Sequence, residues 1–384
     1  MNIKLATFRR DLETENTSPL RRGPRPIFGL VAALFGLFAI DALLFRTPFY
    51  PRILEPNSAT GLVELILHKE QLHQQKDESL VLTMGDSQFA YAPRLANELT
   101  ATTGYTFRHG GVSGSSPRIL YYMLRDLDPD AHAYRAIVFG VNDYDYEDTW
   151  YEPSEDDRVL RYVAAQLRLS DTFDLARSFH TWPLRWEAVL TSVFKGLVYQ
   201  KDLHAFLIHP LDRLSYARLA WDHYDEWSYN YTETDRNMTG LSVDWSTMTA
   251  IYPRWGVSDK EIHDEVQATL LRPALPQNGH LAEYSRLWFG RMIDRYRGSR
   301  TRIVFVRFPR GPVLRPARLK PRPVGSIREF ASRPNVIIAE EHAFDSLEHP
   351  EFFKDAVHLN REGIARFSPM LAEEIYRLLG PPSN

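Results

Sequence analysis

The sequence predicts an α/β protein whose core is a parallel sheet of five strands, with one long insertion and a membrane-spanning helix in front. Short apolar runs alternate with helical patterns in the first half of the chain and end in small or polar residues, as in βαβ units. The alternation stops after residue 149 and resumes at residue 301. An apolar stretch near the N-terminus is long enough to cross a bilayer, which takes roughly 20 residues.

The apolar stretch covers residues 27–45 and follows a basic tail, residues 1–26. The positive-inside rule therefore places the tail in the cytoplasm and the rest of the chain outside. Asp41 lies near the outer end of the stretch, where a charge can reach the interface. No small-x-small cleavage pattern follows directly, which favours an uncleaved signal anchor over a cleaved signal peptide or a soluble core helix. Residues 46–60 contain three prolines and are expected to form a stem.

The core is predicted in two parts, residues 61–149 and 301–384, separated by an aromatic-rich, mainly helical insertion at residues 150–300. Five apolar runs are typical of buried strands, and four stretches have helical spacing. The strands are expected at residues 79–84, 105–108, 135–139, 301–306 and 335–339, and the helices at 62–74, 91–102, 117–127 and 361–379.

The composition excludes several classes of function. A net charge of −3 over 384 residues argues against a nucleic-acid partner. The absence of cysteine excludes a disulfide, a thiolate nucleophile and a cysteine-ligated zinc, and leaves the redox compartment open.

Polar residues that suit acyl-transfer chemistry stand at the ends of these elements. Ser87, in Gly-Asp-Ser, follows the first strand, Gly114 the second and Asn142 the third, while Asp355 and His358 precede the last helix. Open α/β sheets place their chemistry at the carboxyl edge of the strands. A serine becomes nucleophilic when a base takes its proton, and a histidine suits that role near neutral pH. Asp355 can fold back within one turn to orient His358, and the N–H of Gly114 can approach a substrate oxygen closely. This scheme requires no metal and no cofactor.

These four motifs, in this order, resemble those of the SGNH (GDSL-type) hydrolase superfamily, over roughly residues 79–145 and 300–380. The resemblance implies a flavodoxin-like three-layer α/β/α sandwich. It also implies that Ser87 is the nucleophile, His358 the general base and Asp355 the residue that orients it. The oxyanion hole would then consist of the backbone N–H groups of Ser87 and Gly114 and the side-chain amide of Asn142.

Each of these residues has a plainer interpretation. Ser87 can cap the following helix, His358 can be an ordinary loop histidine and Asn142 a turn residue. Gly110 and Gly111 compete with Gly114 for the second position.

The neighbours of the motifs have expected roles of their own. Asp86 and Asp143 are expected to brace their loops rather than to catalyse. His109 is expected to be a loop histidine, with lining of the site as the alternative. Gln88 departs from the aliphatic residue that often follows Gly-Asp-Ser in the superfamily.

The insertion and the loop after the fourth strand leave their roles open. All eight tryptophans lie between Trp150 and Trp288, where they form either a sugar-binding surface or the core of a helical subdomain. Residues 307–322 are basic and proline-rich, and either bind an anionic glycan, an acyl-donor partner or lipid headgroups, or are simply solvated. Two sequons, at Asn230 and Asn237, carry no weight without a eukaryotic secretory context.

Together these observations predict a single-pass protein of the cytoplasmic (inner) membrane whose catalytic domain is periplasmic or otherwise extracytoplasmic. The resemblance to anchored superfamily members that modify envelope glycans implies a serine esterase or O-acyltransferase. Its substrate would be an O-acyl, most simply acetyl, ester of a polysaccharide. The expected partners are that acylated polysaccharide and a membrane-embedded acyl-donor protein. The rival hypothesis is a non-catalytic glycan-binding or assembly component.

Overall fold

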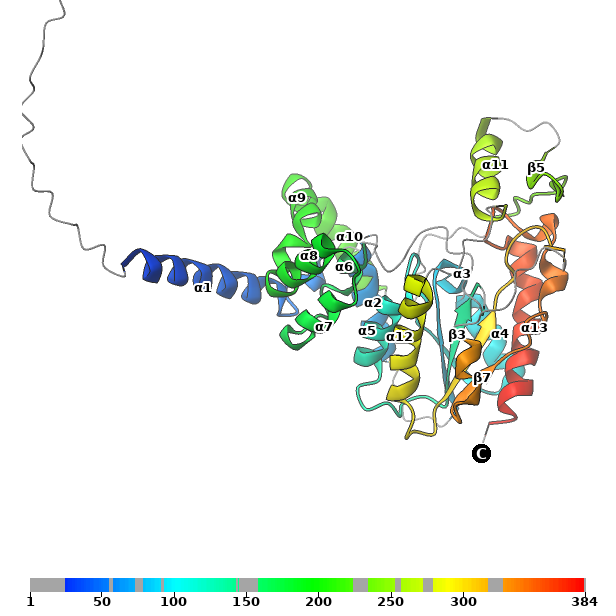
Figure 1. Ribbon diagram of the computed structural model, residues 1–384, viewed down its shortest axis with the longest axis horizontal. Helices are drawn as coiled ribbons and strands as arrows, with labels where there is room; N and C mark the ends of the chain where they lie inside the picture. Colours follow the sequence, from blue (N-terminus) through cyan, green and yellow to red (C-terminus); the bar gives the residue numbers. More distant parts are fainter. Residues whose placement is uncertain are drawn as a thin grey trace, which may run out of the picture.

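A computed structural model of the chain describes the residues in ten stretches: 25–54, 58–72, 79–90, 93–142, 144, 158–223, 234–252, 257–271, 279–316 and 327–382. Five parallel strands form the central sheet, in the order β2-β1-β3-β6-β7 (Figure 1). They are β1 (Leu80–Met84), β2 (Thr106–His109), β3 (Ala136–Val141), β6 (Arg302–Arg307) and β7 (Val336–Ile338). The predicted parallel sheet of five strands is confirmed, and its carboxyl ends share one edge.

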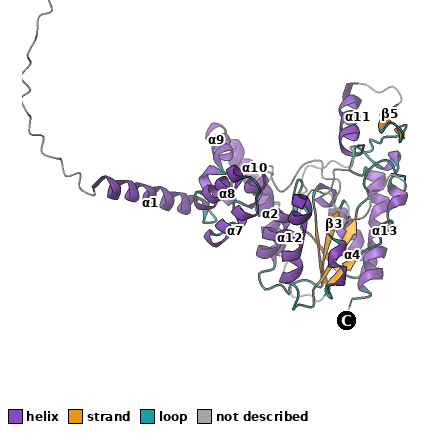
Figure 2. Cartoon of the chain, in the orientation of Figure 1, coloured by secondary structure: helices purple, strands orange, loops and turns teal. Residues whose placement is uncertain are grey.

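Helices cover both faces of this sheet (Figures 1 and 2). Strand residues alternate between the two faces: Leu82 and Ile137 join one buried cluster, and Val81 and Val138 the other. The first cluster includes residues of α2 (Ala59–Leu72), α5 (Pro117–Leu127) and α12 (Gly279–Arg295), and the second residues of α4 (Pro93–Thr103) and α13 (Arg361–Leu379).

Helix α12 lies within the stretch 150–300 but packs against the sheet. The ring of Phe289 lies 5.9 Å from that of Phe139 and 5.2 Å from that of Phe305, with both pairs edge to face. Helix α12 therefore acts as the crossover helix that leads into β6.

Helix α1 (Arg25–Phe45) extends away from the rest of the molecule (Figure 1). Among the described residues, its segment Ile27–Phe45, with a mean hydropathy of 2.4, is the one helix long and apolar enough to cross a membrane. At its far end Asp41 is buried, and its carboxylate accepts hydrogen bonds from the backbone N–H groups of Lys195 (3.0 Å) and Gly196 (2.7 Å). The end of α1 is thus held by the folded domain.

A helical subdomain, residues 158–223, lies at this end of α1 (Figure 1). It contains α6 (Arg158–Val163), α7 (Thr172–Arg177), α8 (Trp182–Val193), α9 (Gln200–Ile208) and α10 (Pro210–Asp222). The described part of the expected stem is folded onto it: the ring of Tyr50 lies 5.1 Å from that of Tyr199, and Tyr50 and Leu54 are buried in the same cluster as Tyr199.

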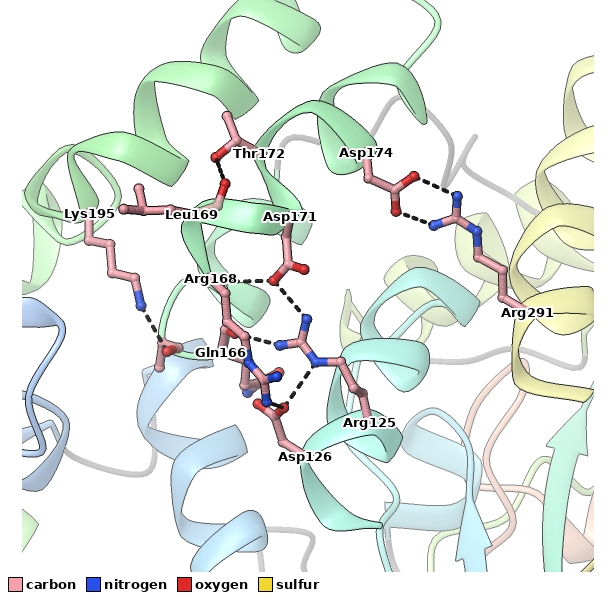
Figure 3. A network of polar contacts seen from close by, with 11 residues as sticks. Arg125, Asp126, Gln166, Arg168, Leu169, Asp171, Thr172, Asp174, Lys195 and Arg291 are labelled. Atoms are coloured by element: carbon pink, nitrogen blue, oxygen red, sulfur yellow. Dashed lines mark hydrogen bonds and ion pairs between the residues drawn. The ribbon is translucent and has the colours of Figure 1, made fainter. Parts of the chain in front are cut away.

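Ion pairs fix the helical subdomain to the core (Figure 3). Arg125 of α5 pairs with Asp171 at 2.7 Å and donates to the carbonyl of Gln166 at 2.6 Å. Arg291 of α12 makes a two-pronged pair with Asp174 of α7. Planar, paired contacts of this kind restrict orientation as well as distance.

A small cap follows the helical subdomain in the sequence. Its described residues are 234–252 and 257–271, and they form β4 (Ser242–Asp244), β5 (Thr249–Ile251) and α11 (Val257–Thr269), apart from the main sheet (Figure 2). The remaining short elements are α3 (Ser87–Ala90) and the 3₁₀ helices η1 (Pro51–Ile53), η3 (Leu169–Asp171), η4 (Lys195–Leu197), η6 (Arg328–Ser332), η7 (Asp345–Leu347) and η8 (Pro350–Phe352).

Candidate active site

Ser87 and His358 meet at the carboxyl edge of the sheet. Ser87 is the first residue of α3, three residues after the end of β1, and His358 lies in the loop before α13. The Oγ of Ser87 lies 2.9 Å from Nε2 of His358, although the two residues are 271 positions apart. This distance is within the range in which a base can take the hydroxyl proton.

Asp355 holds the imidazole of His358 from the other side. The Nδ1 atom lies 2.8 Å and 2.9 Å from the two carboxylate oxygens. Because a carboxylate only accepts, Nδ1 carries the proton and Nε2 presents its lone pair to Ser87. One oxygen of Asp355 also accepts from the backbone N–H groups of Val357 (3.0 Å) and His358 (2.8 Å), which shapes the loop that places the ring.

The same contacts keep Asp355 ionised. Burial alone raises the pKa of this carboxyl, but the hydrogen bond and charge of His358, together with the two backbone N–H groups, hold its pKa below the usual value. The carboxylate is therefore available to stabilise an imidazolium when His358 takes up a proton.

Two neighbours of Ser87 shape its turn. The side chain of Asp86 accepts the backbone N–H of Gln88 at 2.9 Å, which is the bracing role expected of it. Burial raises the pKa of Asp86, and this hydrogen bond partly offsets the rise. The side-chain amide of Gln88 donates to the carbonyl of Val357 at 3.0 Å, so it links the serine turn to the histidine loop.

Gly114 lines the same cavity as Ser87 and His358. Its φ of +71° favours glycine, and a Cβ there would lie 2.9 Å from the hydroxyl oxygen of Tyr162. Gly110, in contrast, donates its N–H to the carbonyl of Thr83 at 2.8 Å and so extends the sheet. Between these two glycines, the geometry favours Gly114 as a donor to substrate.

Asn142 follows β3 directly, is exposed and lines this cavity as well. Asp143, expected to brace this loop, lies outside the described residues. His109 is the last residue of β2 and is not among the described residues that line the cavity.

The cavity has a volume of about 420 Å³ and lies between the carboxyl edge and the cap. The cap contributes Trp245, Glu265, Ala268 and Leu270 to its lining. The sequence showed no local signal for these residues, because only the folded hairpin and α11 bring them over Ser87.

The basic loop after β6 forms the remaining wall. Arg307, the last residue of β6, is buried and pairs with Glu348 at 2.8 Å and Asp345 at 2.6 Å. Burial raises the pKa of Glu348, while the charge of Arg307 opposes the rise. Arg310 and Arg315 line the cavity, so part of this loop belongs to the site. Residues 317–326 lie outside the described part.

The tryptophans of the insertion divide into different environments. Trp288 is fully buried in the core, as the plainer interpretation expects, and Trp245 lines the cavity. Trp182 and Trp186 are 73% and 55% exposed on α8. Asn230 lies outside the described residues, and the side chain of Asn237 accepts the N–H of Thr239.

Within the described residues, no group of three or more histidine, aspartate and glutamate side chains is placed to hold a metal ion. No family model matches the chain, and no curated protein matches it.

Proposed function

We propose that the protein is a membrane-anchored serine esterase or O-acyltransferase of the SGNH type, acting on acyl esters of an extracytoplasmic polysaccharide. The observation that carries this proposal is the chain of contacts from Ser87 through His358 to Asp355, at 2.9 Å and 2.8 Å. A loop serine that merely caps a helix needs neither a histidine on its hydroxyl nor a carboxylate behind that histidine.

The arrangement supports a two-step reaction. The Oγ of Ser87 attacks the acyl carbonyl carbon while His358 takes the hydroxyl proton, and the carbonyl oxygen becomes an oxyanion. The oxyanion collapses, the bond from the acyl carbon to the leaving atom breaks, and His358 returns the proton to that atom, which is a sugar oxygen in hydrolysis and belongs to the acyl donor in transfer. Water or an acceptor sugar hydroxyl then attacks the acyl carbon while His358 takes its proton, and the bond from that carbon to the Oγ of Ser87 breaks as His358 returns the proton to Oγ. Water gives hydrolysis, and a sugar hydroxyl gives transfer.

The oxyanion would be bound by the backbone N–H groups of Ser87 and Gly114 and by the side-chain amide of Asn142. All three residues line the cavity that contains His358. Donors fixed in place before the reaction stabilise the developing charge without reorganisation, and removing one typically costs roughly 100- to 1,000-fold in rate.

The sheet supports the finer assignment of the fold. Its strand order, with the five core strands numbered along the chain, is 2-1-3-4-5, the order of flavodoxin-like sheets. We propose the three-layer α/β/α arrangement on this order and on the helices that cover both faces.

The proposed location rests on α1 and on the basic residues before it. One apolar helix after a basic tail supports a position of the domain outside the cytoplasmic membrane, which would be the periplasm in a two-membrane cell. There the cavity would receive an acylated glycan, and a membrane-embedded protein would supply the acyl group in the case of transfer.

The test of the chemistry uses the full chain in detergent or nanodiscs. A fluorophosphonate probe should label Ser87, and the chain should release nitrophenol from an acetyl ester. Ser87→Ala should lose both reactions. Ser368→Ala is the matched control, because the buried Ser368 hydroxyl donates to the carbonyl of Ile364 within α13, Ser368 does not line the cavity, and its loss should leave the labelling intact. A wild-type chain that is neither labelled by the probe nor active on the ester would refute the proposed enzymatic activity.

The amount of acyl ester on the glycan of living cells distinguishes hydrolysis from transfer. Less acyl ester on the glycan in the Ser87→Ala strain identifies a transferase, and more identifies an esterase. An unchanged glycan, in a strain where deleting the whole chain does alter it, would support the non-catalytic assembly component instead.

A further inference from the structure

We propose that the helical subdomain lies in the interface of the membrane that α1 crosses, with exposed apolar side chains of α8, η4 and the α9–α10 turn among the lipid headgroups. The proposal rests on the anchoring by α1 and is independent of the chemistry at Ser87. We call these side chains the apolar surface; they are Trp182, Trp186, Leu190, Leu197, Leu207, Ile208 and Leu211.

Exposed apolar side chains are concentrated in this part of the molecule. Leu207 and Leu211 are 76% and 79% exposed, and Trp182 is 73% exposed. In the described residues outside α1 and the helical subdomain, the large apolar side chains that are exposed are few: Phe49, Ile251, Leu287, Leu314 and Tyr376. A soluble domain seldom gathers so many in one region unless something covers them.

Contacts with α1 place the apolar surface at the height of the membrane boundary. The Asp41 carboxylate accepts from the backbone of η4, and the ring of Phe38 lies 6.3 Å from that of Phe194, between α8 and η4. Arg46 donates to the carbonyls of Ser192 and Val193 at the end of α8. These contacts involve the last turns of α1, where a spanning helix leaves the hydrocarbon.

Figure 1 shows the same arrangement for the whole subdomain. Helices α7, α8 and α9 gather around the end of α1, and the central sheet lies on the far side of them. Leu190 and Leu197, which flank the contact with Phe194 in the sequence, are both exposed. Two residues of the apolar surface therefore lie within four positions of the residue whose ring contacts α1.

The side chains of the apolar surface are those that membrane interfaces favour. Trp182, Trp186 and Leu190 are spaced four residues apart and lie on one side of α8. Tryptophan rings prefer the headgroup level, where one edge is apolar and the other meets water. The segment 158–223 has nine arginines and lysines against six acidic residues, while the whole chain has a net charge of −3. An excess of basic residues favours a bilayer that contains anionic lipid.

The fluorescence of the protein offers a direct test, because all eight tryptophans lie between Trp150 and Trp288 and α1 contains none. The full chain is reconstituted in vesicles of phosphatidylcholine and phosphatidylglycerol with dibrominated acyl chains. We expect the emission to be quenched relative to vesicles without bromine. The double variant Trp182→Phe/Trp186→Phe should show quenching roughly two- to threefold smaller.

The matched control is Trp221→Phe/Trp245→Phe, which removes one half-buried ring of the same subdomain and one ring of the cleft. It should keep the quenching of the wild-type chain. Phenylalanine preserves the apolar character in both variants, so each should bind the vesicles equally.

A second measurement uses the absence of cysteine from the chain. A spin label at Leu211→Cys should be reached by oxygen and shielded from a water-soluble nickel complex, and one at Lys260→Cys on α11 should show the reverse. The proposal fails if the chain stays in the vesicles while Trp182 and Trp186 are not quenched and the Leu211→Cys label is open to water. That result would mean that the apolar surface binds a protein partner or a second copy instead. A chain that vesicles do not retain would refute the anchoring itself, and the labelling of Ser87 tests the chemistry separately.

Discussion

The side-chain amide of Gln88 donates a hydrogen bond of 3.0 Å to the backbone carbonyl of Val357. This contact joins the residue after the proposed nucleophile to the residue before the proposed base. It gives a role to a residue that departs from the superfamily pattern, because an aliphatic side chain could not make this bond.

We predict that Gln88→Leu lowers kcat for a nitrophenyl ester about tenfold while changing the unfolding free energy by about 1 kcal/mol. The loss of the link lets the serine turn and the histidine loop drift apart. Gln71→Leu, on the exposed side of α2, is the control and should have the activity of the wild type. An unaltered kcat in Gln88→Leu would show that the link does not position the pair.

We predict that Gly114→Ala lowers kcat by roughly 100-fold, because the Cβ would meet the hydroxyl of Tyr162 and shift the backbone N–H away from the oxyanion. Gly104→Ala is a close control. Gly104 also has a positive φ, +75°, but its Cβ would lie near Pro382, at the other end of the sheet. Both variants should lose similar stability in a thermal melt, and Gly104→Ala should keep the wild-type kcat. If Gly114→Ala and Gly104→Ala had the same kcat, Gly114 would not be part of the oxyanion hole.

We predict that Asp355→Asn lowers kcat by about 10²- to 10⁴-fold, because an amide can donate to Nδ1 and favour the wrong tautomer of His358. The substitution also tests the low pKa of Asp355. A carboxyl whose pKa is depressed on folding stabilises the fold above its unfolded pKa, and this contribution disappears as the pH falls through the folded pKa. The stability gap between wild type and Asp355→Asn should therefore be widest near neutral pH and close below about pH 4. A gap that persists in acid would mean that packing, and not the charge, is lost.

A fourth prediction concerns the contact between the core and the helical subdomain. Burial raises the pKa of Glu64 to about 7, while the charge of Lys195 opposes the rise. A raised folded pKa gives stability that is fully present below the unfolded pKa, about 4.5, and is lost as the pH rises through 7. The unfolding free energy of Glu64→Gln, relative to that of the wild type, should thus rise by about 2–3 kcal/mol between pH 4.5 and pH 8, as measured by denaturant unfolding. If the difference in unfolding free energy between the variant and the wild type stayed constant over this pH range, the pKa of Glu64 would not be raised.

Much of the core could be predicted because its signals are local. Buried parallel strands are apolar throughout and end abruptly, so β1, β3 and β6 were visible as runs, and α13 begins and ends where its pattern does. The position of the candidate site residues at the carboxyl edge could be predicted because the carboxyl ends of parallel strands lie on one side of a sheet.

The parts that the sequence could not reveal depend on partners far away in the chain. Asp41 looked like a tolerated charge near an interface, but its partners are backbone groups 154 and 155 residues later. The three-residue strands β4 and β5 are too short to be recognised alone, so Trp245 could not be placed over the cleft. Arg307 looked like part of a solvated loop until the fold supplied Glu348.

The hydrogen bonds from η4 to Asp41 mean that the proposed enzyme is not joined to its membrane helix by a flexible linker. Because the end of α1 is bound to the folded domain, the cleft has a fixed height above the membrane and a fixed orientation to it. Only glycan segments that pass through this narrow layer would be modified. Inserting residues between α1 and η1 would leave the bonds between Asp41 and η4 in place, so a longer connection would not carry the cleft outward.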